Sequence, residues 1–230
     1  MSILVTGGTG FIGSHTVIQL LESGFDVVIL DNLSNSKICV LDRIEKITGK
    51  RPAFYKVDLL DEAGVERVFD ENPEIDSVIH FAGFKAVGES VAFPIMYYHN
   101  NLTGTFNLCN AMQKHNVNRI VFSSSATVYG SPKTVPIKED FPLSTTNPYG
   151  ETKLMIERIL KDVTVANPEF SVSILRYFNP IGAHESGLIG EDPKGIPNNL
   201  LPFVSKVAFG KLKCLKVFGD DYPTDRKSVV

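Results

Sequence analysis

The chain of 230 residues carries 23 lysine and arginine residues against 26 aspartate and glutamate residues, a formal net charge of -3. With 43% hydrophobic residues it can bury a substantial core, enough for one large domain and part of another. No basic stripe for a nucleic-acid backbone and no apolar run of membrane-spanning length occurs, so neither nucleic acid nor a membrane is an expected partner.

Short apolar runs alternate with segments of helical period along most of the chain. The runs ILV, VVIL, AFYKV, VIHF, IVF and VSIL predict strands, and helices are predicted between them at 11–23, 36–48, 62–71, 95–115 and 149–166. Strands that alternate with helices form a parallel sheet covered on both faces. The sequence therefore predicts an α/β fold with a doubly wound, Rossmann-type parallel sheet.

The alternation stops after about residue 177. The loop-rich stretch YFNPIGAHESGLIGEDPKGIPNN follows, then one more helical segment and the run CLKVFG. We therefore expect a Rossmann domain over residues 1–176 and an incomplete, smaller second lobe over residues 177–230.

The cysteines and the first residues bear on the compartment. Cys39, Cys109 and Cys214 are odd in number and widely spaced, which predicts neither a disulfide framework nor a zinc site. The opening MSILVTGG lacks the features of a signal peptide. These features predict a cytoplasmic protein, and the scattered histidines predict no metal site.

A glycine-rich turn follows the first predicted strand. In ILVTGGTGFIGSH, Gly7, Gly8, Gly10 and Gly13 satisfy both G-x-x-G-x-x-G and G-x-G-x-x-G spacing, where a dinucleotide site needs a tight turn and close backbone approach. The helix that follows offers free N–H groups to a pyrophosphate. Asp31 ends the second strand, where a carboxylate binds a ribose diol and repels a 2'-phosphate, so NAD is favoured over NADP.

The stretch NPYGETK places Tyr149 and Lys153 four residues apart on one face of a predicted helix. A phenol with a pKa near 10 is a poor base at neutral pH, and a neighbouring cation lowers that pKa. Upstream, FSSSATVYG puts three serines at the carboxyl end of the fifth strand, the edge where ligands bind in doubly wound sheets. A serine there can hydrogen-bond the substrate oxygen from which the tyrosine takes a proton.

These motifs together resemble the extended short-chain dehydrogenase/reductase superfamily. Further stretches, ILDNLSNSK, HFAGFKAVGESV, LRYFNPIGAH and GEDPKGIPNNLLPFV, are similar to the UDP-glucose 4-epimerase family from residue 2 to about residue 224. The resemblance implies NAD-dependent, reversible epimerisation of UDP-glucose and UDP-galactose at C4 through a 4-keto sugar, and thus a role in galactose metabolism. It also implies a homodimer that pairs through the helices near 95–115 and 149–166.

The resemblance implies roles for individual residues. Tyr149 would be the base, Lys153 its electrostatic helper, and Ser125 the third catalytic residue, chosen because it lies four before the tyrosine of SATVYG. Implied cofactor contacts, besides Tyr149 and Lys153, are Gly7, Gly10, Phe11, Ile12, Gly13, Asp31, Asn32, Asn35, Ser36, Asp58, Leu59, Phe81, Ala82, Gly83, Lys85, Asn100 and Phe178. Implied substrate contacts, besides Ser125 and Tyr149, are Asn179, Asn199, Leu200, Lys216, Val217 and Phe218.

Two related activities and one non-catalytic role are alternatives. A sugar-nucleotide dehydratase commonly has an acidic pair after its triad hydroxyl, whereas Ala126 and Thr127 occupy those positions here, which disfavours elimination of water. A dehydrogenase acting on another nucleotide sugar shares the Tyr–Lys pair. The chain also ends in DYPTDRKSVV where the family continues, so we expect a truncated epimerase with exposed apolar surface, or a protein that binds NAD without catalysis.

Overall fold

A computed structural model describes residues 1–194 and 199–216. The strands are β1 (Ser2–Thr6), β2 (Asp26–Leu30), β3 (Ala53–Tyr55), β4 (Ile75–His80), β5 (Arg119–Ser125) and β6 (Ser171–Tyr177). The helices are α1 (Phe11–Glu22), α2 (Cys39–Thr48), α3 (Glu62–Glu71), α4 (Val87–Ala92), α5 (Pro94–Tyr98), α6 (Gly104–Lys114), α7 (Pro148–Ala166) and α8 (Leu200–Ala208). A π-helical turn, η1 (His99–Thr103), joins α5 to α6, and a 3-10 turn, η2 (Ala126–Tyr129), follows β5.

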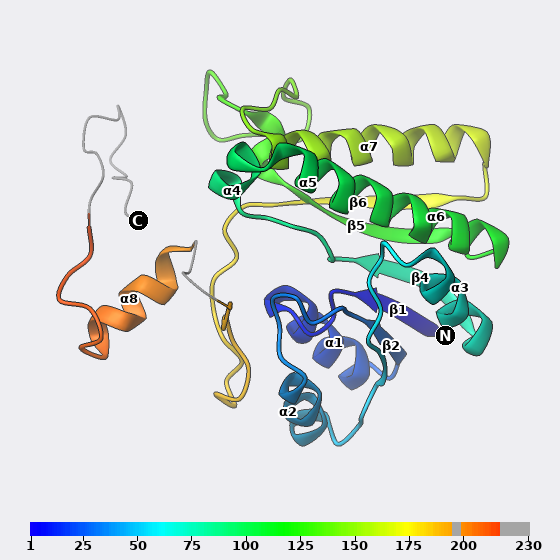
Figure 1. The fold of residues 1–230 in the computed structure, drawn as a ribbon, viewed down its shortest axis with the longest axis horizontal. Coiled ribbons are helices and arrows are strands. Elements are labelled where there is room, and N and C mark those ends of the chain that lie inside the picture. Colours follow the sequence, from blue (N-terminus) through cyan, green and yellow to red (C-terminus); the bar gives the residue numbers. More distant parts are fainter. Residues whose placement is uncertain (195–198, 217–230) are drawn as a thin grey trace.

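All six strands are parallel and lie in the order β3-β2-β1-β4-β5-β6 (Figure 1). The order reverses direction between β1 and β4, and in doubly wound sheets ligands bind at the carboxyl ends of the strands at this switch point. The predicted α/β fold with a doubly wound parallel sheet is therefore confirmed.

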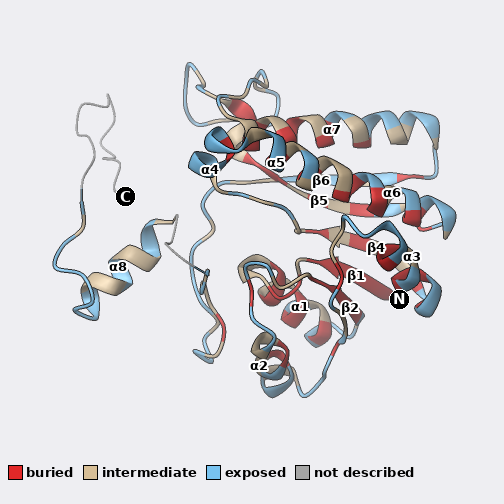
Figure 2. Ribbon diagram, viewed as in Figure 1, coloured by how far each residue is buried: buried red, intermediate tan, exposed pale blue. Residues whose placement is uncertain are grey.

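The core lies in two layers because alternate strand residues face opposite sides of the sheet. On one side Leu4 and Val78 pack with α3, α6 and α7, and on the other Ile3 and Val5 pack with α1 and α2. Figure 2 shows the buried residues concentrated on the strands and on the helix faces turned toward them. No helix in the described part of the chain is long and apolar enough to cross a membrane.

The prediction of one continuous helix over 95–115 is wrong. The structure has α5, the π turn η1 and then α6, with α4 as an additional short helix before them. The π turn brings the buried Asn101 side chain onto the loop after β4, where it accepts a hydrogen bond from the Phe84 N–H (2.8 Å). π turns inside helices occur frequently at functional sites.

The segment after β6 differs from the rest of the molecule. The helix α8 buries none of its residues, and Leu200, Leu201 and Val204 are exposed. Figure 1 shows α8 beyond the long loop segment that leaves the sheet after β6. The expected exposure of apolar side chains in this part of the chain is therefore observed.

Candidate active site

The glycine turn lies between β1 and α1, at the switch point of the sheet. Gly7 has a φ of +70°, and a Cβ there would come 2.8 Å from the Ala82 backbone nitrogen. A Cβ at Gly13 would overlap the Gly7 carbonyl oxygen and lie 2.8 Å from the Gly8 Cα atom. The turn therefore brings the start of α1 against the strand and leaves its backbone open to an anion.

Replacing Gly13 with alanine is expected to displace this turn and to weaken NAD binding at least about tenfold, since overpacking a tight site costs roughly 1–3 kcal/mol. Isothermal titration with NAD measures the change. Gly88→Ala in α4 is the matched control, because a Cβ there meets no atom within 4 Å. Unchanged NAD affinity in Gly13→Ala would show that the turn does not form the binding site.

Asp31 follows β2 and is buried among donors. Its carboxylate accepts hydrogen bonds from the Thr9 N–H (3.1 Å), the Leu33 N–H (2.9 Å) and the Ser36 hydroxyl (3.2 Å). The Thr9 and Ser36 hydroxyl groups also hydrogen-bond each other (2.7 Å). The carboxylate is thus fixed in orientation next to the glycine turn, at the place where a ribose diol would meet it.

The loops after β3 and β4 complete this edge. Asn32 donates to the Asp58 carboxylate (2.8 Å), which ties the loops after β2 and β3 together. The Asn100 amide donates to Asn101 Oδ1 (2.9 Å), and Asn101 Nδ2 donates to the Phe84 carbonyl oxygen (3.1 Å). Asn101 therefore fixes the segment that contains Phe81, Ala82, Gly83 and Lys85, the residues implied as cofactor contacts in the loop after β4.

The start of α7 positions the reactive pair. The Asn147 side chain accepts from the Gly150 N–H (2.8 Å), and Pro148 occupies the first turn, so the helix begins just before Tyr149. Tyr149 and Lys153 are both buried. The Lys153 ammonium donates to the Ser123 carbonyl oxygen (2.8 Å) and lies 4.9 Å from the centroid of the Phe122 ring. Burial lowers the pKa of Lys153 to about 8, which leaves it mostly charged at neutral pH.

The pH dependence of stability tests this buried ammonium. The pKa of Lys153 is about 8 in the folded protein and near 10.5 in the unfolded chain, so between these values the unfolded chain binds more protons. Across that window the free energy of unfolding should rise with pH by roughly 3 kcal/mol more than in Lys153→Met. Urea titrations from pH 7 to pH 10.5 measure this, with Lys161→Met, an exposed site on the same helix, as control. Parallel curves for wild type and Lys153→Met would contradict the buried charge.

The expected lowering of the Tyr149 pKa by Lys153 is not seen in the protein alone. Burial raises the pKa of Tyr149 above its ordinary value, and a hydrogen bond with the Ser125 side chain opposes this only in part. The Lys153 ammonium is instead directed to the Ser123 carbonyl oxygen. No cation within residues 1–194 and 199–216 lowers the Tyr149 pKa, so a positive charge from a bound ligand would favour the phenolate.

The three serines at the end of β5 have different partners. Ser123 presents its carbonyl oxygen to Lys153, and the Ser124 hydroxyl donates to Glu157 Oε1 (2.6 Å). The Ser125 hydroxyl oxygen accepts a hydrogen bond from the Thr127 N–H (3.2 Å), and the Ser125 side chain also lowers the pKa of Tyr149 against the effect of burial. Ser125 stays the predicted third catalytic residue.

Sequence reasoning missed an ion pair that fixes α7 on the sheet. Glu157 is fully buried, and Arg176 in β6 contacts its two carboxylate oxygens at 3.0 and 2.8 Å. Arg176 also donates to the Tyr129 hydroxyl (2.8 Å). The spacing in the sequence could have indicated Glu157, because it lies four residues beyond Lys153 and eight beyond Tyr149, on the same helix face.

The residues implied as substrate contacts beyond β6 are not brought together in the same way. Asn179 is exposed just after β6, as is the neighbouring Phe178, which was implied as a cofactor contact, and Lys216 is exposed after α8. Asn199 is the N-cap residue of α8, and Leu200 is its first residue. Val217 and Phe218 lie outside the described residues.

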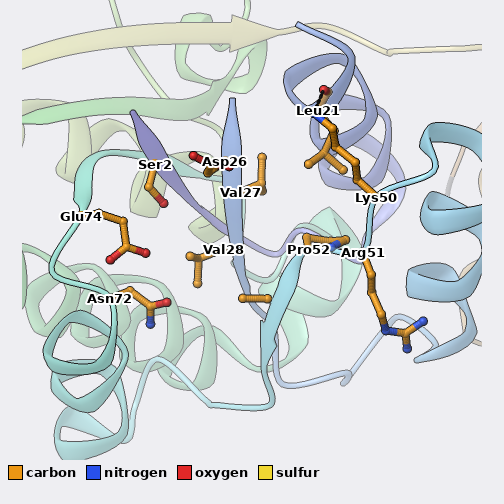
Figure 3. A pocket seen from close by; sticks show the side chains of 11 residues that line it. Ser2, Leu21, Asp26, Val27, Val28, Lys50, Arg51, Pro52, Asn72 and Glu74 are labelled. Carbon is orange, nitrogen blue, oxygen red and sulfur yellow. Dashed lines mark hydrogen bonds between the residues drawn. The ribbon is translucent and has the colours of Figure 1, made fainter. Parts of the chain in front are cut away.

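Two of the cavities formed by the described residues lie at opposite edges of the sheet. One of about 350 Å³ lies between the start of α1 and the loop after β6, and its lining includes Phe11, Ile12 and Tyr177. The other, of about 330 Å³, lies at the amino ends of β1 and β2, away from the switch point (Figure 3). The two basic side chains that line this cavity already have partners. Lys50 donates to the Leu21 carbonyl oxygen, and Arg51 pairs with carboxylates of α2.

His80 and one cluster of acidic residues are accounted for by contacts within the chain. His80 is buried, hydrogen-bonds the Thr6 hydroxyl (2.7 Å), and has its pKa lowered to about 3 by burial and by the nearby Lys153 charge. Among the described residues, one group of possible metal ligands occurs, namely Glu66, Asp70 and His115. The ammonium of Lys114 pairs with Glu66 and lowers its pKa, so an ion-pair network accounts for this group.

The fold and the glycine turn define a dinucleotide-binding α/β protein with a buried Tyr–Lys pair. The model of the NAD dependent epimerase/dehydratase family matches residues 3–224. The chain belongs to this family.

Comparison with individual proteins gives more specific relatives within this family. The chain is similar to the UDP-glucose 4-epimerase of Bacillus subtilis (strain 168), 66% identical over 97% of this chain and 66% of that protein. It is 60% identical to that of Dictyostelium discoideum, over 96% of this chain and 64% of the relative. The structure resembles that of UDP-glucose 4-epimerase from Bifidobacterium longum in complex with NAD+ and UDP, with a TM-score of 0.94 and 61% identity, over 98% of this chain and 67% of that one. The chain thus spans about two thirds of the length of the curated relatives it matches.

Proposed function

We propose that the protein catalyses the NAD-dependent interconversion of UDP-glucose and UDP-galactose at C4. The observation that carries this proposal is the buried Tyr149, whose pKa the Ser125 side chain lowers, one helical turn before the buried Lys153 at the sheet edge that holds the glycine turn. Relatives up to 66% identical are UDP-glucose 4-epimerases, and the similar structure from Bifidobacterium longum contains NAD+ and UDP.

The residues of the chain that line the expected cofactor site fit a dinucleotide. The backbone at Gly7 and Gly13, where a Cβ would collide, would hold the pyrophosphate at the start of α1. The oriented Asp31 carboxylate would accept the ribose hydroxyl groups and would repel a 2'-phosphate. When bound, NAD+ supplies a hydride acceptor and a positive charge, and a nearby positive charge favours the phenolate of a tyrosine.

The chain's own residues move the proton. Tyr149 would take the proton of the C4 hydroxyl as the C4 hydrogen leaves, which gives a 4-keto sugar, and would return the proton when hydrogen comes back to the opposite face. Ser125 would hydrogen-bond the same sugar oxygen. Lys153, mostly charged at neutral pH and one helical turn beyond Tyr149, would contact the cofactor ribose, and its charge would add to that of NAD+ in favouring the phenolate. Because hydrogen leaves and returns, the net reaction is an isomerisation.

A direct assay tests this function. Purified protein is mixed with UDP-galactose, UDP-glucose is detected with a coupled dehydrogenase, and NAD content is measured on the same sample. We expect UDP-glucose to form until the two sugars reach equilibrium. Bound NAD without any UDP-glucose would refute the proposal.

A second function, NAD binding without turnover, is favoured by one observation. The helix α8, which contains implied sugar-nucleotide contacts, buries none of its residues, whereas the glycine turn and Asp31 are well ordered by contacts. The same assay separates the two functions, because only an epimerase forms UDP-glucose.

We infer in addition that the protein forms a homodimer through α5, α6 and α7. Ile95 in α5, Phe106 in α6 and Val165 in α7 are exposed apolar side chains, and such side chains favour burial against another surface. Light scattering should give twice the mass of one chain, and Ile95→Asp should shift the protein toward the monomer. A monomeric wild-type protein at micromolar concentration would contradict the dimer.

A further inference from the structure

The segment 183–194 returns from the end of β6 to the loop after β2. Ile189 is buried in the core under α1 and α2 and anchors the segment. Beyond it, the Lys37 ammonium pairs with Asp192 at 2.6 Å, and the Lys194 N–H donates to Asn35 Oδ1 at 3.0 Å. The segment is therefore held beside Asn35 and Lys37, next to the Asp31 carboxylate.

Glu191 lies in the middle of this segment and has two partners. Its side chain is only 11% exposed, and its Oε1 atom lies 4.0 Å from the Lys85 ammonium. The same oxygen accepts a hydrogen bond from Asn199 Nδ2. Lys85 belongs to the loop after β4, and Asn199 is the N-cap residue of α8. One carboxylate oxygen thus joins the cofactor edge of the sheet to the start of α8.

Among the described residues, packing contributes little to the placement of α8. No residue of α8 is buried. Asparagine is a favoured N-cap residue, but the Asn199 Oδ1 atom accepts no capping hydrogen bond, and the Nδ2 atom of the same side chain donates to Glu191. A hydrogen bond to a carboxylate shielded from water is stronger than one between neutral groups. Glu191 therefore contributes to the placement of α8 in a way that packing does not.

We propose that Glu191 is a positioning residue that couples the cofactor contact Lys85 to the sugar-nucleotide contact Asn199. The proposal rests on the proposed function, which assigns Lys85 to NAD and Asn199 to the UDP-sugar. Glu191 contacts neither the sugar nor the cofactor in this proposal. It acts by holding Lys85 and Asn199 at its Oε1 atom. Binding of one ligand orders the carboxylate and its partners and so favours binding of the other, and this coupling is reciprocal.

Titration with UDP, with and without NAD, measures the coupling. In the wild-type protein, NAD should raise the affinity for UDP at least about fivefold. In Glu191→Ala this factor should fall below about twofold, while Glu185→Ala, an exposed glutamate on the same segment, should keep it. Glu191→Gln keeps an acceptor for Asn199 but loses the charge that faces Lys85, so it should retain UDP affinity without NAD and lose the coupling. A residue with only a structural role would weaken both affinities and leave their coupling unchanged, which would overturn the proposal.

Hydrogen exchange on the ligand-free protein gives a second readout. It separates the proposed role of Glu191 from the proposed epimerase function. Glu191→Ala should speed amide exchange at the start of α8 and in the loop after β4, relative to wild type and to Glu185→Ala. If the wild-type protein bound neither NAD nor UDP, the proposed function would fail, and exchange would still decide whether Glu191 holds the two segments. Equal exchange in all three proteins would overturn the role of Glu191.

Discussion

Replacing Tyr149 with phenylalanine is expected to reduce epimerase turnover by about 10²- to 10⁴-fold, the range that a positioned general base contributes. The substitution removes only the hydroxyl oxygen, which is the atom that exchanges a proton with the sugar. The ring stays in place in its buried site, so the protein should remain folded and NAD should remain bound.

Turnover with UDP-galactose and NAD content of the purified variant are the two measurements. Tyr98→Phe, the same change on the neighbouring helix α5, is the control and should retain turnover. Equal losses of NAD and turnover in Tyr149→Phe would assign Tyr149 a structural role, and unchanged turnover would remove it from the mechanism.

Replacing Arg176 with methionine is expected to lower the free energy of unfolding by about 3–5 kcal/mol, because it leaves the Glu157 carboxylate buried without its cation. Glu157 is fully buried, and its other partner is the Ser124 hydroxyl. The loss should also reach the active site, because the pair holds α7, with Tyr149 and Lys153, against β5 and β6. Urea unfolding measures the stability.

Two comparisons sharpen this prediction. Arg51→Met removes an arginine that also contacts two carboxylates but at the surface, where ion pairs contribute little, so its effect should be far smaller. Combining Arg176→Met with Glu157→Leu removes both charges and should recover much of the lost stability. If the single Arg176→Met variant were as stable as wild type, the buried pair would not fix α7.

The fold could be predicted from the sequence because its elements follow strong periodic patterns. The helix predicted at 62–71 matches α3, and that at 149–166 matches α7 to within one residue. The continuous helix at 95–115 was wrong, because the break depends on Asn101 reaching across to Phe84 and Thr152. Such contacts join residues 17 and 51 positions apart and leave no local pattern.

The site was predictable where the chemistry requires particular residues at fixed spacing. The glycine turn, Asp31 and the pair Tyr149 and Lys153 all have such a spacing. Glu157 shares the helix face of Tyr149 and Lys153, but its partner Arg176 has no fixed spacing to it, since their pairing depends on how α7 lies across β5 and β6. The pKa of Tyr149 also could not be derived from spacing, because burial decides its direction.

In the proposed reaction, hydrogen leaves C4 of the sugar and returns to the same carbon while Tyr149 exchanges the hydroxyl proton. UDP-galactose labelled with deuterium at C4 is the substrate that tests this, with the product examined by NMR and mass spectrometry. We predict that UDP-glucose forms with the deuterium still at C4. UDP-glucose with solvent hydrogen at C4, or no UDP-glucose from protein that contains NAD, would contradict the proposed reaction.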